Sequence, residues 1–316
     1  MPLPTTIIFG PTGHVGSAAA RTAQQLGAKV VLAMRDPQKP IKGLSYDQEK
    51  EGGFERVQAD LTKPETIGHA VRTTGAKHAF IYLAFGTTDH MRSTIEALKA
   101  GGIEFVVFLS SISVEGDIRE IPPADFISYA HAQIEVNLDE VFGTDGYIAI
   151  RPAYFNTNAG GWAGMIREGE VKIAYPDAKL DWISPEDIGK AAGTLLVQGI
   201  QATKGAEQRN SIPLCGPKLV SQRDAVGIFG RAVGKDVKVT ELDEKDGVKN
   251  MLENGVPEFV AGPLMTMLRA WYRDEEGLGP FEGEAYEKAA ANLRKYAGTV
   301  TSLEEWAEAN KGIFSV

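Results

Sequence analysis

Six apolar runs of strand length alternate with helix-like segments in the first half of the chain, and they constrain the fold more than any other feature. The runs are continuous rather than strictly alternating, which is typical of strands that helices cover on both faces of a parallel sheet. This pattern predicts an α/β protein with a doubly wound parallel sheet, the Rossmann arrangement. The runs are "TTIIFG" (5–10), "KVVLAM" (29–34), "ERVQAD" (55–60), "HAFIYLAF" (78–85), "FVVFLSS" (105–111) and "GYIAIRP" (146–152).

After residue 152 the alternation is less regular, and a second, smaller lobe is expected there. Segments 179–184 and 210–216 resemble later strands connected to further helices. The Rossmann domain is therefore predicted to comprise residues 1–152 with returning segments at about 179–200 and 210–216. Residues 153–178 and 217–316 are predicted to form a discontinuous C-terminal α/β substrate lobe.

Two helix starts support this organisation. Thr62-Lys-Pro-Glu65 has the pattern of a capping box with proline near the first turn. Ser184-Pro-Glu-Asp187 is a similar start, with aspartate in place of the usual glutamate. Both follow segments that are expected to be strands.

Composition and charge indicate a globular protein of the cytoplasm. The chain is 43% hydrophobic and 24% charged, and no apolar run approaches the roughly 20 residues of a membrane span. The N-terminus lacks the basic start and apolar core of a secretory signal, and the single cysteine, Cys215, agrees with a reducing compartment. We therefore expect a protein that stays in the cytoplasm and has no membrane partner.

Charge and residue usage also disfavour two kinds of site. The formal net charge is −9, from 42 acidic and 33 basic residues, and no dense Lys/Arg run is present to neutralise a nucleic-acid backbone. The five histidines and one cysteine show no ligand spacing typical of a metal site. Neither direct nucleic-acid binding nor a bound metal is expected.

A glycine-rich turn follows the first predicted strand. "IIFGPTGHVGS" places Gly10, Gly13 and Gly16 between that strand and a helical run. Each glycine has a physical role: a tight turn, close approach of the backbone to a pyrophosphate, and close packing of helix on strand. The free N–H groups of the helix start would bind the anion. The residues predicted to bind the cofactor here are Gly10, Thr12, Gly13, His14, Val15 and Gly16.

The spacing G-x-x-G-x-x-G differs from the G-x-G-x-x-G of ordinary dehydrogenases, and it resembles the NmrA-like family of atypical short-chain dehydrogenases. Further landmarks appear in the same order as in that family and extend over nearly the whole chain. They are "MRDP", "ADLTKPETI", "LSS", "RPAYFNTN", "DWISPEDIGKAA" and the ending "TVTSLEEWAEANKGIF". The resemblance implies a protein that binds NAD(P), and the family includes both reductases and non-catalytic sensors.

The choice between NAD and NADP depends on the end of the second strand. Met34 occupies the position at which a carboxylate would bind the ribose 2′-hydroxyl. Arg35 follows, with Lys39 nearby, and a guanidinium can bind a phosphate through two hydrogen bonds. Asp36 is a counter-signal, because it can neutralise Arg35 or turn toward the ribose. NADP(H) is predicted in preference to NAD(H).

Other cofactor contacts are expected at the ends of later strands. By resemblance to the family, the segment beside the adenine is Asp60 and Leu61, although Asp60 can instead cap the next helix. The end of the fourth strand is expected to pass beside the cofactor at Ala84, Phe85 and Gly86.

The stretch "YAHAQIE" (129–135) lacks the usual catalytic pair of short-chain dehydrogenases. Four residues after Tyr129, where a lysine would lower the pKa of the tyrosine, stands Gln133. At 100° per residue, His131 falls on the apolar stripe of the helix and Tyr129 lies roughly opposite. By resemblance to a Lys-Ala-x-Ile-Glu pattern, His131 replaces the family's active-site lysine.

His131 is therefore predicted to lie beside the cofactor and to be a candidate proton donor, since its ordinary pKa of about 6.5 permits this near neutrality. The alternative is a core histidine with satisfied hydrogen bonds. Tyr129 is kept as a reserve acid in case the first turn is irregular.

Substrate contacts are predicted from three segments. Ser110 and Ser111 end the fifth strand at the carboxyl edge, where ligands bind in such sheets, Ser110 toward the cofactor and Ser111 toward the substrate; alternatively they satisfy loop backbone groups. After the sixth strand, Tyr154 is expected beside the cofactor and the substrate, and Phe155 and Asn156 beside the substrate; alternatively all three serve only packing. Segment 257–272, with Met265 and Trp271, is either a buried packing helix or a pocket lid.

These features predict an NADPH-dependent reductase of a small, largely apolar carbonyl, quinone or enone, with His131 or water as the proton source. The second hypothesis is a non-catalytic NADP(H) redox sensor, whose ligand-bound form another protein recognises. The third is an isomerase or cyclase that uses the same pocket without net redox chemistry.

Overall fold

The computed structural model describes residues 3–205, 209–273, 281 and 283–315. Backbone contacts divide the chain into two compact units. Unit 1 comprises Met1–Pro152, Pro185–Leu214 and Asn292–Thr299, and unit 2 comprises Ala153–Ser184, Cys215–Ala291 and Val300–Val316.

Unit 1 contains a seven-stranded sheet in which every strand is parallel to its neighbours. The order β3-β2-β1-β4-β5-β6-β9 places β1 and β4 side by side at the point where the chain reverses direction across the sheet. The predicted doubly wound Rossmann fold is confirmed. In sheet order, the strands are Glu55–Gln58, Val30–Met34, Thr6–Phe9, His78–Tyr82, Phe105–Leu109, Tyr147–Pro152 and Ser211–Leu214.

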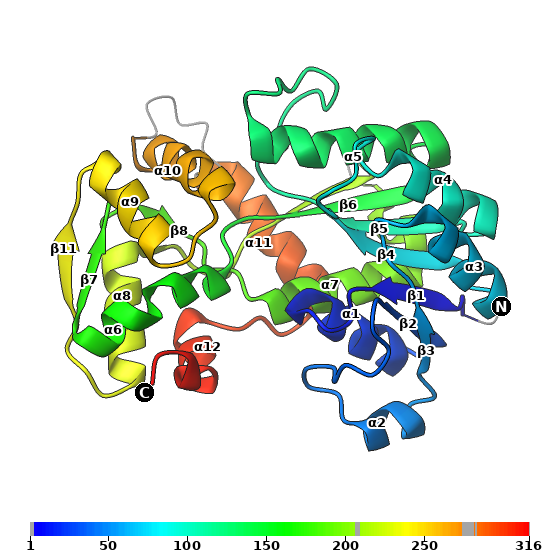
Figure 1. The fold of residues 1–316 in the computed structure, drawn as a ribbon, viewed down its shortest axis with the longest axis horizontal. Helices are drawn as coiled ribbons and strands as arrows, with labels where there is room; N and C mark the ends of the chain where they lie inside the picture. The colour runs from blue at the N-terminus through cyan, green and yellow to red at the C-terminus, as the bar shows by residue number, and fades with distance from the viewer. Residues whose placement is uncertain (1–2, 206–208, 274–280, 282, 316) are drawn as a thin grey trace. The chain divides into compact units, whose positions relative to one another are not determined.

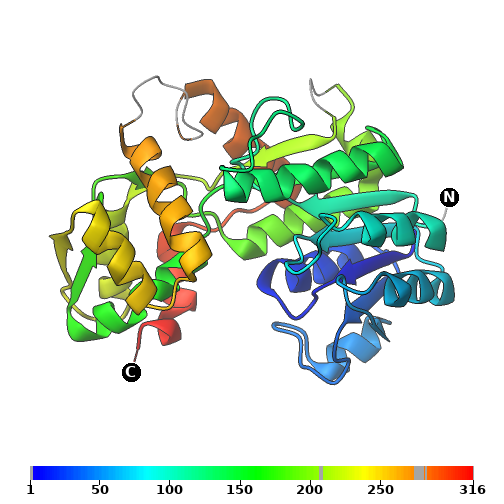
Figure 2. The same cartoon turned by 45° about the horizontal axis from the view of Figure 1, so that its top comes forward.

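Helices cover both faces of this sheet, as Figures 1 and 2 show. One face carries α1 (His14–Gln25) and α7 (Pro185–Gln198), and the other carries α3 (Pro64–Thr74), α4 (Arg92–Gly101) and α5 (Phe126–Phe142). Because both faces are covered, all residues of β1 and β2 are buried, which explains their continuous apolar runs. The short α2 (Tyr46–Glu51) precedes β3, and η2 (Gly199–Thr203) follows α7.

The hydrophobic core of unit 1 lies between the sheet and the α3–α4–α5 layer. Ile67, Ile95 and Leu138 from the three helices are fully buried in one cluster with Ile81 and Phe108 from the strands. Each of these helices therefore buries one apolar stripe against the sheet, as the 3.6-residue period of its apolar residues requires.

Unit 2 is built from short strands and several helices. Strand β7 (Glu170–Ile173) pairs in parallel with β11 (Lys238–Glu241), and β8 (Lys179–Leu180) pairs antiparallel with β10 (Val220–Ser221). Segment 179–184 therefore contributes only a two-residue strand. The helices are η1 (Asn156–Trp162), α6 (Ala163–Glu168), α8 (Gln222–Ala232), α9 (Glu244–Glu253), α10 (Glu258–Arg273), α12 (Leu303–Ala309) and η3 (Lys311–Ile313); α11 (Gly283–Ala297) begins in unit 2 and ends in unit 1.

The expected capping box at Thr62 is wrong. Helix α3 starts at Pro64 with Lys63 at the N-cap, and no side chain caps it. Proline is favoured at the first helical position, which moves the cap to Lys63 and leaves Thr62 outside the helix. The Thr62 hydroxyl donates to Asp60 instead, at 2.8 Å. The second expected helix start was Ser184-Pro-Glu-Asp187. Helix α7 does begin at Pro185, but the buried Ser184 hydroxyl does not cap it and has no hydrogen-bond partner among the described residues.

Helices α1 and α7 pack closely through small residues. A Cβ atom added at Gly189 would lie 2.4 Å from Ala18 Cβ and 2.5 Å from the Val15 carbonyl oxygen. At Gly193 it would lie 2.7 Å from the Ala19 carbonyl oxygen. Much of this contact is with backbone, which cannot rotate out of the way.

We predict that Gly189→Ala lowers the free energy of unfolding by about 1–3 kcal/mol, because the methyl group forces the two helices apart. The matched control is Gly164→Ala in helix α6, where the added Cβ meets only Asn254 Oδ1 at 4.0 Å. The control should be neutral or slightly stabilising, since alanine has the higher helix propensity. Urea unfolding of both variants measures the difference, and equal effects would contradict the close packing.

Candidate functional site

The turn between β1 and α1 depends on glycine at two positions. Gly10 has φ = +68°, in the left-handed region that favours glycine. A Cβ at Gly16 would lie 2.3 Å from the Gly10 carbonyl oxygen, so any side chain there would separate the helix from the strand. The turn is thus held in a conformation that brings the start of α1 directly against the end of β1.

The N-terminus of α1 carries no competing side chain. Its N-cap is Gly13, and no side chain accepts a hydrogen bond from the first turn. The first N–H groups of a helix lack acceptors within the helix, so they are available to an anion. Thr12, Gly13 and His14 are exposed here, whereas Val15 is buried.

His14 is neutral at this helix start. Burial lowers its pKa, and the positive charge of Lys42 lowers it further, although Glu186 acts in the opposite direction. The Lys42 ammonium lies 3.3 Å from His14 Nδ1 and donates to it. The exposed end of the loop therefore presents a lysine cation and a neutral imidazole.

Arg35 follows β2 and is exposed. No ion pair to Arg35 is formed by the residues that the structure describes. Asp36 forms no ion pair with it among the described residues, and its carboxylate accepts a hydrogen bond from the Gln38 N–H at 3.0 Å. The guanidinium therefore remains available to a ligand.

The segment with Lys39 is held by a buried ion pair that the sequence motifs did not reveal. Arg56 donates to both carboxylate oxygens of Glu49, at 2.6 Å each. The same guanidinium donates to the carbonyl oxygens of Pro37 and, at 2.9 Å, of Lys39. The hydrogen bond to Glu49 raises the pKa of Arg56 despite its burial. Arg56 thus orders the loop after β2 from the side of β3.

Asp60 is turned toward its own loop. It accepts hydrogen bonds from the N–H and the hydroxyl of Thr62, at 3.0 and 2.8 Å. Burial acts to raise the pKa of Asp60, but these hydrogen bonds and the charge of Arg35 outweigh it, so the pKa is lowered. Leu61 is buried, and its carbonyl oxygen accepts from Thr94 Oγ1 at 2.7 Å.

The three residues after β4 that were predicted to lie beside the cofactor differ in exposure. Ala84 is buried, Phe85 is 58% exposed, and Gly86 has φ = +98°. Tyr82, which the motif search missed, lies over the glycine turn: a Cβ at Gly10 would be 2.6 Å from its ring. An aromatic side chain therefore accompanies the glycine loop at the carboxyl edge of the sheet.

Helix α5 is regular at "YAHAQIE", because it starts at Phe126 and the Tyr129 N–H donates to the Asp125 carbonyl oxygen at 2.8 Å. The ring of His131 lies 6.2 Å from that of Phe108 on β5, between centroids. The ring of Tyr129 packs edge-on against His90, 5.6 Å away. His131 thus faces the sheet, and Tyr129 faces the segment before α4.

The side chain of His131 is anchored to its own helix, and its lowered pKa favours the neutral ring. Its Nδ1 lies 2.8 Å from the Ile127 carbonyl oxygen, so Nδ1 carries the hydrogen and donates. Burial lowers the pKa of His131, while this hydrogen bond and the charge of Glu135 oppose the shift. In this tautomer Nε2 is an acceptor, which suits a hydroxyl group better than it suits proton donation.

The two serines after β5 already have partners. Ser110 donates its hydroxyl to Glu135 Oε1 at 2.6 Å, and the Ser111 hydroxyl pairs with that of Ser113 at 2.9 Å. Glu135 is 1% exposed and also receives two hydrogen bonds from Arg151. Neither Glu135 nor Arg151 was predicted; the glutamate of the Ile134-Glu135 pair was the only signal.

Apart from Ser111, which lies in unit 1, the predicted substrate residues belong to unit 2. Tyr154 is buried among aromatic rings, with centroids 5.1 Å from Trp182 and 6.4 Å from Trp271. Burial raises the pKa of the Tyr154 hydroxyl, so it is not an acid near neutrality. The structure therefore brings Tyr154 and Trp271 together, as the apolar wall requires.

The other three predicted substrate residues of unit 2 differ in their surroundings. Phe155 is half-buried and forms a parallel bridge with Ile183, and Met265 is 3% exposed, inside helix α10. Asn156 is 1% exposed, and neither polar atom of its amide has a partner among the described residues. An unsatisfied buried amide is costly, which marks Asn156 as a group with unused hydrogen-bonding capacity.

Asp181 is a functional candidate to which the sequence assigned no role, although it begins the landmark "DWISPEDIGKAA". It is 1% exposed, and its two oxygens accept hydrogen bonds from the N–H groups of Tyr154 and Gly216, at 2.8 and 2.7 Å. Burial raises its pKa to about 7, although these hydrogen bonds act in the opposite direction. Burial and the charge of Asp181 raise the pKa of the neighbouring Cys215, which is therefore a thiol.

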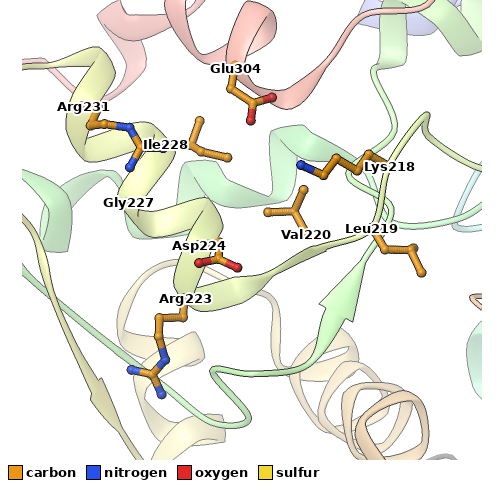
Figure 3. Close-up of a pocket in the computed structure, with 9 residues that line it drawn as sticks. All are labelled: Lys218, Leu219, Val220, Arg223, Asp224, Gly227, Ile228, Arg231 and Glu304. Carbon is orange, nitrogen blue, oxygen red and sulfur yellow. The ribbon is translucent and has the colours of Figure 1, made fainter.

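A pocket of about 290 Å³ lies in unit 2, beside α8 and the start of α12 (Figure 3). Its charged lining residues are Lys218, Arg223, Asp224, Arg231 and Glu304, over an apolar base that includes Val220 and Ile228. None of the predicted site residues lines it. Arg223 is paired with Asp177 at 2.8 Å.

The described part of the chain contains no group of three or more His, Cys, Asp and Glu side chains arranged to hold a metal ion. Nor does any described helix have the length and apolar character that crossing a membrane requires.

The fold and the glycine turn define the class: a Rossmann-type α/β protein with a loop of the kind that binds dinucleotides. The model of the NmrA-like family matches residues 4–307, and the chain belongs to that family. A relative from Gibberella fujikuroi, "Nitrogen metabolite regulation-like protein bik4", is 36% identical over 320 residues, which cover 95% of this chain and 94% of the relative.

Two solved structures share the fold. The NADPH-dependent quinone oxidoreductase of Escherichia coli, complexed with NADPH, has a TM-score of 0.72 and 18% identity, covering 96% of this chain and 99% of that one. NmrA, a negative transcriptional regulator complexed with NAD, has a TM-score of 0.71 and 18% identity, covering 98% and 96%.

The raised pKa of Asp181 predicts a pH dependence of stability. A folded-state pKa of about 7, above the ordinary 3.8, means that this group contributes stability below pH 4 that is lost as the pH rises through 7. The free energy of unfolding of the wild type, measured in urea, should therefore fall from pH 5 to pH 8 by more than that of Asp181→Asn, which cannot ionise. Asp177→Asn, at an exposed ion pair, is the control. Parallel pH profiles for wild type and Asp181→Asn would refute the assignment.

Proposed function

We propose that the chain binds NADP(H) at the carboxyl edge of the sheet in unit 1. Three observations support this: the left-handed Gly10 turn, the close approach of Gly16 to Gly10, and the uncapped start of α1. The residues that would hold the dinucleotide are those of the glycine turn, Arg35 and Lys39 after β2, Asp60 and Leu61 after β3, and Ala84, Phe85 and Gly86 after β4.

The preference for NADP(H) over NAD(H) rests on Arg35. Its exposed guanidinium lies at the end of β2, and Asp36 is occupied by its own loop. A cation at this place would bind the 2′-phosphate, and Met34, at the position where a carboxylate would accept from a free 2′-hydroxyl, cannot do so.

We further propose a reductase, in which the bound nicotinamide supplies a hydride to an apolar acceptor. The observation that carries the choice of acceptor is the neutral His131, with its hydrogen directed to Ile127. Tyr129 lies on another face of α5, so neither predicted acid supplies a proton. The substrate should then be one whose reduced form is a stabilised anion that water can protonate, such as a quinone, rather than a simple ketone.

In this proposal His131 binds rather than protonates. With hydrogen on Nδ1, its Nε2 would accept a hydrogen bond from a ribose hydroxyl and so orient the cofactor. Tyr154, Phe155, Asn156, Met265 and Trp271 would supply an apolar wall and one amide for the substrate, while Ser110 and Ser111 would act mainly through the partners described above. The protein would work in the cytoplasm.

A second candidate function is NADP(H) sensing, with a protein partner that recognises the bound form. The 36% identical relative, described as nitrogen metabolite regulation-like, favours it, because the similarity extends over nearly the full length of both chains. The missing side-chain acid is also compatible with binding without turnover.

Arg35→Ala tests the cofactor preference. Loss of a bidentate contact with the 2′-phosphate should weaken NADPH binding about tenfold or more and leave NADH binding unchanged. Fluorescence titration measures both affinities. Lys77→Ala is the control: it removes one cation just before β4, at the amino edge of the same sheet, and should change neither. Equal losses for NADPH and NADH would contradict the assignment.

Turnover separates the reductase from the sensor. A reductase should oxidise NADPH with quinones much faster than with simple aromatic ketones. His131→Gln, which keeps a hydrogen-bonding group, should retain more NADPH affinity than His131→Ala. The kcat of the wild type with quinones should not change between pH 6 and 8 in the way that a titrating His131 would cause. Tight NADPH binding without turnover on any quinone would favour the sensor, and a kcat that follows the protonation of His131 would refute its neutral role.

A further inference from the structure

A buried carboxylate joins helix α5 to the ends of two strands. Glu135, 1% exposed, accepts hydrogen bonds from Arg151 Nε at 3.0 Å and Arg151 Nη2 at 2.6 Å. Its Oε1 also accepts from the Ser110 hydroxyl at 2.6 Å. All three residues belong to unit 1, and the side chain of Arg151 is itself only 11% exposed.

The three residues come from consecutive elements of one crossover. Ser110 directly follows β5, Arg151 lies near the end of β6, and Glu135 lies at mid-length in α5, which connects the two strands. The two strand ends are themselves paired, since the Ser110 N–H donates to the Ile150 carbonyl oxygen at 2.8 Å. Arg151 Nη1 also donates to the Val114 carbonyl oxygen at 2.8 Å, which adds the loop after β5.

This arrangement fixes α5 in two directions. A bidentate Arg–carboxylate pair restricts both distance and angle, unlike an apolar contact, which tolerates sliding. If α5 slid by one residue it would move 1.5 Å along its axis and turn by about 100°, and Glu135 would leave both partners. The network therefore specifies the rotation and the axial position of the helix against the carboxyl edge.

His131 lies one helical turn before Glu135, so its position follows from the same restraint. Residues four apart share a helix face, and His131 indeed lies toward the sheet, against Phe108. The bond from Nδ1 to the Ile127 carbonyl fixes the ring relative to the helix. The helix in turn must be fixed relative to the sheet, and Glu135 provides the polar contacts that do so.

We propose that Glu135 is a positioning residue: through Ser110 and Arg151 it sets where α5 holds the His131 ring at the end of β5. That this ring meets the cofactor rests on the proposed function, but its placement against Phe108 does not. Neither a catalytic role nor a ligand contact is assigned to Glu135 itself.

The charges around Glu135 support this role. Arg151 is the cation that pairs with it, Ser110 donates from β5, and His131 precedes it on its own helix. The charge of Glu135 also acts on Tyr147 of β6. Burial, and after it the charge of Glu135, raise the pKa of the Tyr147 hydroxyl. Because Glu135 also acts to raise the pKa of His131, neutralising the carboxylate should lower that pKa further.

The test uses the full-length protein without cofactor, with labelled histidine and phenylalanine. The ring signals of His131, one of five histidines, are assigned by their loss in His131→Gln. In Glu135→Gln, we expect the His131–Phe108 ring cross-peaks to weaken or vanish and the pKa of His131 to fall. Arg151→Lys, which keeps the charge but not the two-pronged geometry, should weaken the cross-peaks to an intermediate degree, and it serves if Glu135→Gln does not fold.

The control is Glu49→Gln, which breaks a second, partly buried bidentate Arg–Glu pair of unit 1, with Arg56. It should lower stability while leaving the ring signals and the pKa of His131 unchanged. Unchanged His131–Phe108 cross-peaks in folded Glu135→Gln or Arg151→Lys would overturn the proposal, as would an equal effect of Glu49→Gln.

NADPH titration of the same proteins separates this proposal from the function. If the wild type binds NADPH, Glu135→Gln should bind it about tenfold more weakly. If the wild type does not bind NADPH but the cross-peaks still depend on Glu135, the proposed function fails and the positioning role stands.

Discussion

The close approach of α1 to its neighbours is the contact on which the rest of unit 1 depends. Helix α1 meets β1 where Gly16 lies against the carbonyl of Gly10, and it meets α7 through Ala18, Ala19 and two glycines of that helix. Larger side chains would displace the start of α1 from the carboxyl edge of the sheet. Small residues therefore serve the fold at the same place where the first N–H groups of α1 are left without a capping side chain.

The chemistry of the site is set by what surrounds His131. A lysine at this position would carry a charge, whereas this histidine is half-buried, has a lowered pKa and donates to a backbone carbonyl. The site thus offers a hydrogen-bond acceptor where a cation would stand in the related pattern. Histidine in place of lysine is compatible with cofactor binding. It would restrict the substrates to which a reductase of this kind could transfer a hydride.

Local patterns predicted the sheet well and the site only in part. Strands β1, β2 and β4–β6 were visible because continuous apolar runs reflect burial on both faces, a property that each run shows by itself. The face of α5 that carries His131 was likewise predictable, since helical periodicity needs only the helix. The capping box at Thr62 was mispredicted because Pro64 takes the first helical position. The pattern of residue types contains both a capping threonine and a helix-starting proline, and it does not say which of them sets the helix start.

The order of strands and helices along the chain, the glycine turn and the resemblance to the NmrA-like family could be predicted from the residues alone, because they depend on residues that are neighbours along the chain. The folded chain was needed to show that Glu135 pairs with Arg151 and Ser110, that Arg56 holds the loop after β2, and that Asp181 accepts from Tyr154 and Gly216. Such pairs join residues 16 to 35 positions apart. A buried charge or hydrogen bond depends on which distant groups the fold brings within about 3 Å, and no local pattern contains that information.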